Sequence, residues 1–181
     1  MKHNDINVNL GESVDLNNKI NNNLKIEISK LSNEDKAYIA GFLDGDGALL
    51  TQIVKDNSYK YRFYIRYTIQ FVQNKKNHNI MLWLKSRLKV GYVRTKKDNM
   101  SEYAITSKYA IVIIIQELLP YLIIKKELGQ FILKIINEEK NIESREDFIK
   151  VCKLVDKTVN YTYSKNRKIT SDIVKQYFNS L

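Results

Sequence analysis

The sequence alternates between two kinds of side chain from residue 61 to residue 71. Odd positions carry apolar or aromatic residues, and even positions carry polar or cationic residues such as Arg62 and Arg66. Because successive side chains of a strand point to opposite faces of a sheet, this period of two predicts one long strand. We expect its apolar face to lie on a core and its basic face to meet water or a ligand.

The surrounding sequence predicts helices and strands in the order αββαββα, followed by further helices. Ser32 and Asp35 have the spacing of a helix start, and Asp56-Asn57-Ser58 has the composition of a hairpin turn. Strands are expected over residues 48–55, 61–71, 92–96 and 102–106, and helices over 32–44, 78–89, 107–119, 125–137, 144–158 and 170–179. This order favours an α+β domain with helices on one face of an antiparallel sheet. We expect the domain over residues 31–181, after a flexible polar, Asn-rich tail over residues 1–30.

The charge and composition favour a nucleic-acid partner. Thirty Lys and Arg against 20 Asp and Glu leave a formal charge of +10, which predicts attraction to a polyanion. The single cysteine, Cys152, excludes an internal disulfide and suits a reducing compartment. The longest apolar run, residues 110–115, is too short to span a bilayer. We expect an intracellular protein with no membrane partner, and the abundance of residues with A/T-rich codons hints at an organelle such as a chloroplast or mitochondrion.

The segment Tyr38–Gly47 holds three of the six glycines of the chain. Ala40 and Gly41 are small residues on an otherwise bulky helix, and small residues let a second helix approach closely. The glycines after Asp44 let the backbone turn sharply, so that Asp46 lies just past a helix end. Hard oxygen ligands for Mg²⁺ could converge there.

An EF-hand calcium loop is an alternative interpretation of the Asp-Gly-Asp-Gly sequence. Such a loop needs an oxygen ligand at its fifth position, Gly at its sixth and Glu at its twelfth. Counted from Asp44, these positions hold Ala48, Leu49 and Lys55, which excludes the EF-hand. A purely structural turn that ends the helix stays open as an alternative. With only two histidines, the chain does not fit an HNH nuclease or a histidine-rich metal site.

The segment Tyr38–Gly47 closely resembles the LAGLIDADG motif of homing endonucleases, and the order αββαββα resembles that family's fold. Residues 31–181 are most similar to single-motif, homodimeric members of the algal chloroplast type. The resemblance implies a curved antiparallel sheet as the DNA-binding face, with additional C-terminal helices. It also implies an intron-encoded enzyme of intron homing, which hydrolyses phosphodiester bonds in a long pseudo-palindromic DNA target and leaves 3′ overhangs.

The resemblance implies the following partners and roles. The partners are double-stranded DNA, a second copy of the chain and Mg²⁺, for which Mn²⁺ is expected to substitute, without a small-molecule cofactor. The catalytic residues would be Asp46, Gln73 and Lys125, the metal ligands Asp46 and the carbonyl of Gly45, and the dimer-interface residues Tyr38, Ala40, Gly41 and Asp44. A family position that often holds Arg holds Asn77 here, after Lys75 and Lys76, so the source of a third basic partner stays open.

These residue types suit phosphodiester hydrolysis. A metal ion acidifies water and clamps phosphate oxygens. A lysine near the phosphate stabilises growing negative charge, and a glutamine orients water without titrating.

The basic sheet face is the expected DNA-reading surface. A two-stranded ribbon fits the major groove, where Arg prefers guanine and Gln prefers adenine. We expect Glu102 to orient Arg94 or Lys96, or to accept from cytosine, and the cluster Lys165, Arg167 and Lys168 to suit phosphates. The candidate DNA-binding residues are Gln52, Ser58, Tyr59, Arg62, Tyr64, Arg66, Gln70, Arg94, Lys96, Glu102, Lys165 and Lys168.

Two other functions stay open for a chain of this family. One is an intron maturase, an RNA-binding splicing cofactor, and the other is a catalytically inactive DNA-binding protein of the same fold. The intact Asp46, Gln73 and Lys125 favour the nuclease, because a protein that only binds has no need of them.

Overall fold

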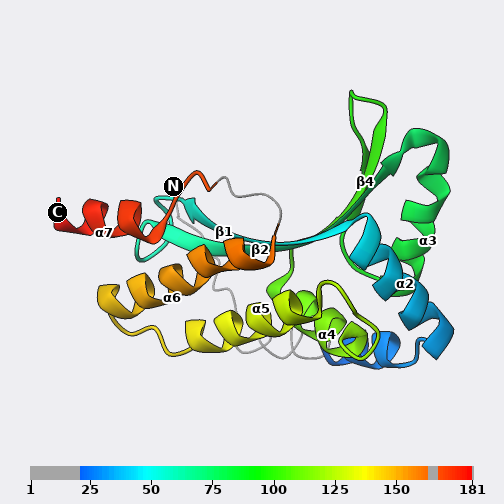
Figure 1. The fold of residues 1–181 in the computed structure, drawn as a ribbon, viewed down its shortest axis with the longest axis horizontal. Coiled ribbons are helices and arrows are strands. Elements are labelled where there is room, and N and C mark those ends of the chain that lie inside the picture. Colours follow the sequence, from blue (N-terminus) through cyan, green and yellow to red (C-terminus); the bar gives the residue numbers. More distant parts are fainter. Residues whose placement is uncertain (1–20, 163–166, 181) are drawn as a thin grey trace, which may run out of the picture.

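The protein folds into a long, curved antiparallel sheet with helices packed against one face (Figure 1). The structure is a computed structural model, and it describes residues 21–162 and 167–180. The strand order is β1-β2-β4-β3. Helices α4, α5 and α6 lie along the β1–β2 hairpin, while α2 and α3 lie at the other end of the sheet (Figure 1). The opposite sheet face carries no helix among the described residues.

The elements follow the predicted order αββαββα. In chain order they are α2 (Asn33–Gly45), β1 (Gly47–Lys55), β2 (Phe63–Asn74), the 3₁₀ turn η1 (Lys75–Asn77), α3 (His78–Leu88), β3 (Tyr92–Thr95), β4 (Met100–Ile105), α4 (Lys108–Leu118), α5 (Lys126–Glu139), α6 (Arg145–Lys157), η2 (Thr158–Tyr161) and α7 (Ser171–Asn179). The predicted caps are present: Ser32 accepts from the N–H of Asp35, and Ser144 forms a capping box with Asp147.

The predicted tail is too long at its C-terminal end. Residues 21–29 are helical, and Ile28 is 1% exposed in the core. Leu24, four residues and about one helical turn before Ile28, packs against the same core. These two apolar residues on one side of the helix attach the otherwise polar segment to the core. Residues 1–20 lie outside the described residues.

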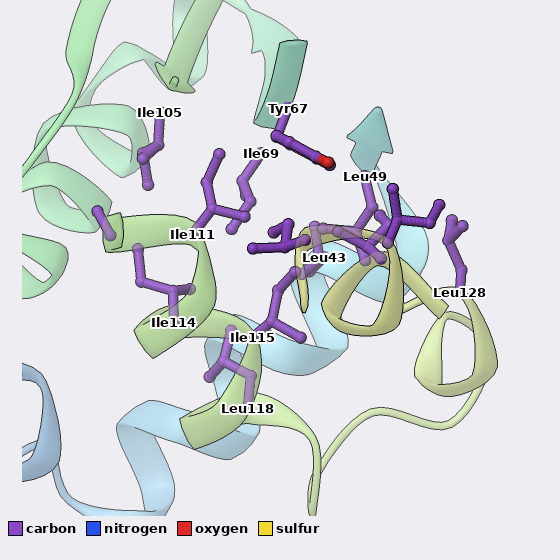
Figure 2. Close-up of a cluster of buried hydrophobic side chains, with 14 of the residues drawn as sticks. Leu43, Leu49, Tyr67, Ile69, Ile105, Ile111, Ile114, Ile115, Leu118 and Leu128 are labelled. Carbon is purple, nitrogen blue, oxygen red and sulfur yellow. The ribbon is translucent and has the colours of Figure 1, made fainter. Parts of the chain in front are cut away.

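The alternation of β2 sorts its side chains as predicted, from Phe63 onward. Phe63, Ile65, Tyr67, Ile69 and Phe71 are all buried. Figure 2 shows part of the resulting core, in which side chains from α2, β1, β2, β4, α4 and α5 meet. The strand is therefore fixed in register by the burial of every second residue.

The predicted start of this strand is wrong by two residues. Tyr61 and Arg62 belong to the hairpin turn, where Arg62 has a φ of 59°. The N–H of Asp56 donates to the carbonyl of Arg62, and the N–H of Arg62 donates to the carbonyl of Tyr59. Arg62 is therefore in a closed turn instead of on the polar face of β2.

We expect opposite changes in stability from two substitutions in the segment between α3 and β3. Gly91 has a φ of 81°, and an added Cβ would lie 2.4 Å from the carbonyl oxygen of Ala104. Gly91→Ala should therefore lower the free energy of unfolding by about 1–3 kcal/mol. Lys89 has a φ of 63°, which glycine adopts without strain, so Lys89→Gly should raise the free energy of unfolding by roughly 0.5–1 kcal/mol. Urea unfolding measures both, and a loss in both variants would contradict this account.

Candidate functional site

The junction of α2 and β1 presents an exposed carboxylate. Asp46 caps the C-terminus of α2, and its N–H donates to the carbonyl of Phe42 at 3.0 Å. A Cβ on Gly47 would lie 2.7 Å from the Cα of Leu43, so only glycine fits where helix and strand meet. The chain turns within one residue, and the side chain of Asp46 is left in solvent.

A second carboxylate, two residues earlier, is buried and fixes a distant segment. Asp44 is 9% exposed. Its Oδ2 accepts from the N–H groups of Ile123 at 2.7 Å and Ile124 at 3.1 Å, and its Oδ1 accepts from the N–H of Lys125 at 2.9 Å. The end of α2 thereby holds the start of α5. This contact lies within one chain, which is a different role from the interface support predicted for Asp44.

Lys125 lies at the N-cap of α5, beside both carboxylates. Its Nζ donates to the carbonyl oxygen of Asp44 at 2.5 Å. Partial burial lowers the pKa of the Lys125 ammonium below its ordinary value, while the negative charges of Asp44 and Asp46 oppose that shift. An ammonium group has three donors, so donors remain for a further acceptor.

Gln73 completes the group from the end of β2. Its Nε2 donates to Oδ2 of Asp46 at 2.5 Å, and its Oε1 accepts from Nδ2 of Asn77 at 3.2 Å. The fold therefore brings the three predicted catalytic residues together from α2, β2 and α5. The contact with Asn77 was not predicted, because it depends on how η1 turns the chain back towards Gln73.

The residues at this position fit an open magnesium site. The carboxylate of Asp46 is a hard oxygen ligand, as Mg²⁺ prefers, and the carbonyl of Gly45 precedes it. Within residues 21–162 and 167–180, no group of three or more His, Cys, Asp or Glu could hold a metal alone. An ion here would need further oxygens from water, phosphate or a second chain.

The outer face of α2 is only partly as predicted. Tyr38 is 54% exposed, and Gly41 is exposed with no atom within 4 Å of an added Cβ. The prediction for Ala40 is wrong, because Ala40 is 0% exposed in the core of its own chain. Neighbouring helical residues point about 100° apart, so Gly41 faces outward while Ala40 faces inward.

Two exposed isoleucines were missed by the sequence reasoning. Ile123 is 86% exposed and Ile124 is 67% exposed, in the segment that Asp44 holds. A pair of branched apolar residues in a short connection after Pro120 was the available signal. Exposed apolar side chains in a segment held to the last turn of α2 are typical of a surface that meets a partner.

The open sheet face carries most of the predicted DNA-binding residues. Gln52 pairs with Arg66 across β1 and β2, and Nη2 of Arg66 donates to Oε1 of Gln52 at 2.7 Å. Tyr64 stacks on Tyr59 with ring centroids 4.4 Å apart. Gln70 lies on the same face as Arg66, four residues along β2. This face runs from near Asp46 to the hairpin turn, with its polar residues mainly on β2 and with Ala48, Leu50 and Val54 of β1 beside them.

The other predicted DNA-binding residues lie at the edges of this face. Ser58 is in the turn, where its N–H and hydroxyl both donate to Asp56, and the guanidinium of Arg62 donates to the carbonyl of Asn57 at 2.6 Å. Lys168 is exposed and lines a groove of about 320 Å³ together with Gln52, Arg66 and Arg167. Lys165 lies outside the described residues.

Glu102 is an internal anchor of the sheet face. It is 1% exposed, and its carboxylate lies 2.8 Å from Nη2 of Arg94 and 2.6 Å from Nζ of Lys96. Burial alone would raise the pKa of Glu102, but Lys96 and Arg94 hold that pKa below its ordinary value. The predicted position of Glu102 across from Arg94 and beside Lys96 is confirmed. Whether it orients these cations towards DNA or accepts from cytosine stays a prediction.

Comparisons with known proteins agree on one family. The family description "LAGLIDADG endonuclease" matches residues 39–137. DNA endonuclease I-CreI of Chlamydomonas reinhardtii is 32% identical over 84% of this chain and 94% of its own length. DNA endonuclease I-CvuI of Chlorella vulgaris is 30% identical over 80% of this chain and 90% of its own length.

Solved structures show the same fold. The structure of I-CvuI with an I-CreI target, in 2 mM Mg and with the DNA not cleaved, matches with a TM-score of 0.75 and 29% identity, over 80% of this chain and 92% of that chain. The archaeal intron-encoded endonuclease I-Vdi141I, complexed with DNA, matches in fold with a TM-score of 0.70 and 20% identity, over 80% and 94%. In the part of this chain that the structure describes, no helix has the length and apolarity to cross a membrane.

The two neighbouring carboxylates should differ sharply in their effect on stability. Asp44→Asn puts an amide against three backbone donors, so the free energy of unfolding should fall by about 2 kcal/mol. Asp46→Asn changes an exposed side chain and should alter the free energy of unfolding by about 0.5 kcal/mol or less. Urea unfolding at one fixed protein concentration measures both. Equal losses would show that Asp44 is not the structural member of the pair.

Proposed function

The chain belongs to the LAGLIDADG endonuclease family, and from this we propose that it is a site-specific homing endonuclease that cuts double-stranded DNA with Asp46, Gln73 and Lys125. The observation that carries the proposal is the convergence of these three side chains at the edge of an open, basic sheet face. A surface that only bound nucleic acid would need neither an exposed carboxylate nor a partly buried lysine beside it.

Each residue of the group has a distinct chemical task. Asp46, with the carbonyl of Gly45, would hold Mg²⁺, which supplies charge to polarise the phosphate and to acidify water. Gln73 contacts Asp46 and can orient a water molecule in the same space. Lys125 donates to the carbonyl of Asp44, where its ammonium group interacts electrostatically with Asp46, and it can stabilise the negative charge that develops on the phosphate. Mn²⁺ has the same preference for oxygen ligands and is expected to substitute.

We propose a homodimer that pairs the outer faces of two α2 helices. Gly41 leaves open space on that face, and Ile123 and Ile124 expose apolar surface next to it. Burial of these side chains against a second copy would remove apolar area from water. A twofold dimer would also bring two copies of Asp46 to one DNA duplex, so the target would be pseudo-palindromic. The length of the target, the cut on both strands and the 3′ overhangs are proposed from the resemblance to the family.

The sheet face is proposed to read bases, and its margin to hold phosphates. Arg66 and Gln52 are hydrogen-bonded to each other in mid-strand, where side chains can reach base edges in the major groove. Glu102 keeps Arg94 and Lys96 in place for the same task. Lys168 lies at the margin and suits a phosphate contact, which carries no sequence information.

An organellar intron is the proposed genetic setting. The relatives in two algae and the abundance of residues with A/T-rich codons support this origin.

Removing the charge of Asp46 should separate cutting from binding. Asp46→Asn keeps the shape of the side chain but removes a charged metal ligand, so cleavage with Mg²⁺ should be abolished while DNA binding is largely kept. The measurement is cleavage of a site selected from a random DNA library, in Mg²⁺ and in EDTA, with binding titrated in parallel. Asp172→Asn on α7, at the far end of the molecule, makes the same charge change and should cut like the wild type (Figure 1). Near-normal cutting by Asp46→Asn would refute the metal assignment.

A bulky residue on the outer face of α2 should weaken the dimer. Gly41→Leu has room within its own chain, so the fold should stay intact while the two helices are held apart. Sedimentation over a range of protein concentrations should show at least a tenfold weaker dimer, equivalent to about 1.4 kcal/mol. Gln176→Leu adds a comparable side chain to an exposed position of α7 and should have no effect. An unchanged dimer in Gly41→Leu would place the interface elsewhere.

A further inference from the structure

Asn77 uses its side chain in an unusual way for its position in the chain. It is the N-cap residue of α3, but its side chain makes no cap hydrogen bond. Asn is among the residues that best cap a helix N-terminus, and a cap bond typically contributes about 1 kcal/mol. Instead, its Nδ2 donates to Oε1 of Gln73 at 3.2 Å. Asn77 is also the last residue of η1, with a φ of −98° and a ψ of 21°, so the chain enters α3 from a turn and this side chain is available for a contact outside the helix.

The direction of this hydrogen bond is fixed by Asp46. An ionised carboxylate can only accept hydrogen bonds, so Gln73 must turn its NH₂ group towards Oδ2 of Asp46. The carbonyl oxygen of the same amide then faces Asn77, which must donate. The three side chains form a directional relay from Asn77 through Gln73 to Asp46.

Among the described residues, the side chain of Gln73 has no hydrogen bond other than those with Asp46 and Asn77. The relay borders a pocket of about 430 Å³, open to solvent and lined by Phe42, Gln73, Asn77 and Asn79 among others. The two ends of a glutamine amide have nearly the same size, so packing cannot distinguish them. Only the hydrogen bonds to Asp46 and Asn77 can.

We propose that Asn77 is a positioning residue for DNA cleavage, which it supports by holding the amide of Gln73 with its NH₂ group towards Asp46. The inference rests on the proposed nuclease function. It matters most when a cation shares Asp46, because the carboxylate then attracts the NH₂ group of Gln73 less strongly. The bond from Asn77 is what keeps the amide from turning over at that stage.

The substitution Asn77→Asp tests the relay with little risk to the fold. Asp has the same shape and caps helices as well as Asn, but it replaces the donor with an acceptor. The NH₂ group of Gln73 is then drawn towards residue 77. The single-turnover cleavage rate at saturating protein should fall about tenfold, with the dissociation constant for DNA changed by about twofold or less.

Asn79→Asp is the matched control. Asn79 lines the same pocket, lies in the first turn of the same helix and gains the same charge, but it has no hydrogen bond to Gln73. It should cut within about twofold of the wild-type rate. An equal loss in both variants would mean that the added charge acts and not the relay, which would overturn the proposal.

A double-mutant cycle distinguishes positioning from a general structural role. In a Gln73→Ala background the relay is already broken, so Asn77→Asp should cause no further loss of rate. Independent, multiplying losses would overturn the proposal. The side-chain amide resonance of Gln73, followed by NMR without DNA, should shift in Asn77→Asp and stay in place in Asn79→Asp.

The NMR readout separates this inference from the proposed function. A wild-type protein that never cuts DNA refutes the nuclease function and, with it, the role of Asn77 in cleavage. An unshifted Gln73 resonance in Asn77→Asp refutes the relay itself, even when the wild-type protein cuts.

Discussion

The three hydrogen bonds accepted by Asp44 are the constraint on which the site depends. They join the last turn of α2 to residues 123–125, about 80 positions later in the chain. A buried carboxylate is stable only when its oxygens are satisfied, so the end of one helix and the start of another have a single relative position. That position places Lys125 beside Asp46. Asp44 therefore fixes the geometry of the site, while the carboxylate of Asp46, two residues later, stays exposed within it.

The alternation of apolar and polar residues along β2 gives the two faces of the sheet different roles. One face packs on the core, and the other is open to a partner. Apolar residues of β2 such as Tyr67 and Ile69 lie in the core on the helix side of the sheet (Figure 2). Arg66 and Gln70 lie on the opposite, open face. The buried Glu102 beneath Arg94 and Lys96 gives two long, mobile side chains a preferred position before any ligand arrives. A partner then meets side chains that are partly ordered, which reduces the entropy lost on binding.

The sequence was sufficient where the chain repeats a regular pattern or carries a capping residue. The alternation of β2, the cap at Ser144 and the break after Asp44 all predicted the observed elements. It was insufficient where a residue's direction depends on contacts made far along the chain. The inward position of Ala40 is set by the core that α4 completes, and the left-handed turn at Arg62 is set by hairpin closure. The link between Asn77 and Gln73 likewise exists only once η1 has formed.

The span of the Asp44 contact also has a consequence for the order of events during synthesis. Asp46 and Gln73 leave the ribosome well before residues 123–125, which complete the contact. A chain that stops before residue 123 has neither Lys125 nor the segment that Asp44 holds. In the proposed mechanism, the catalytic group is therefore complete only after residues 123–125 have been made and joined to Asp44, so the late part of the chain decides when an active copy exists.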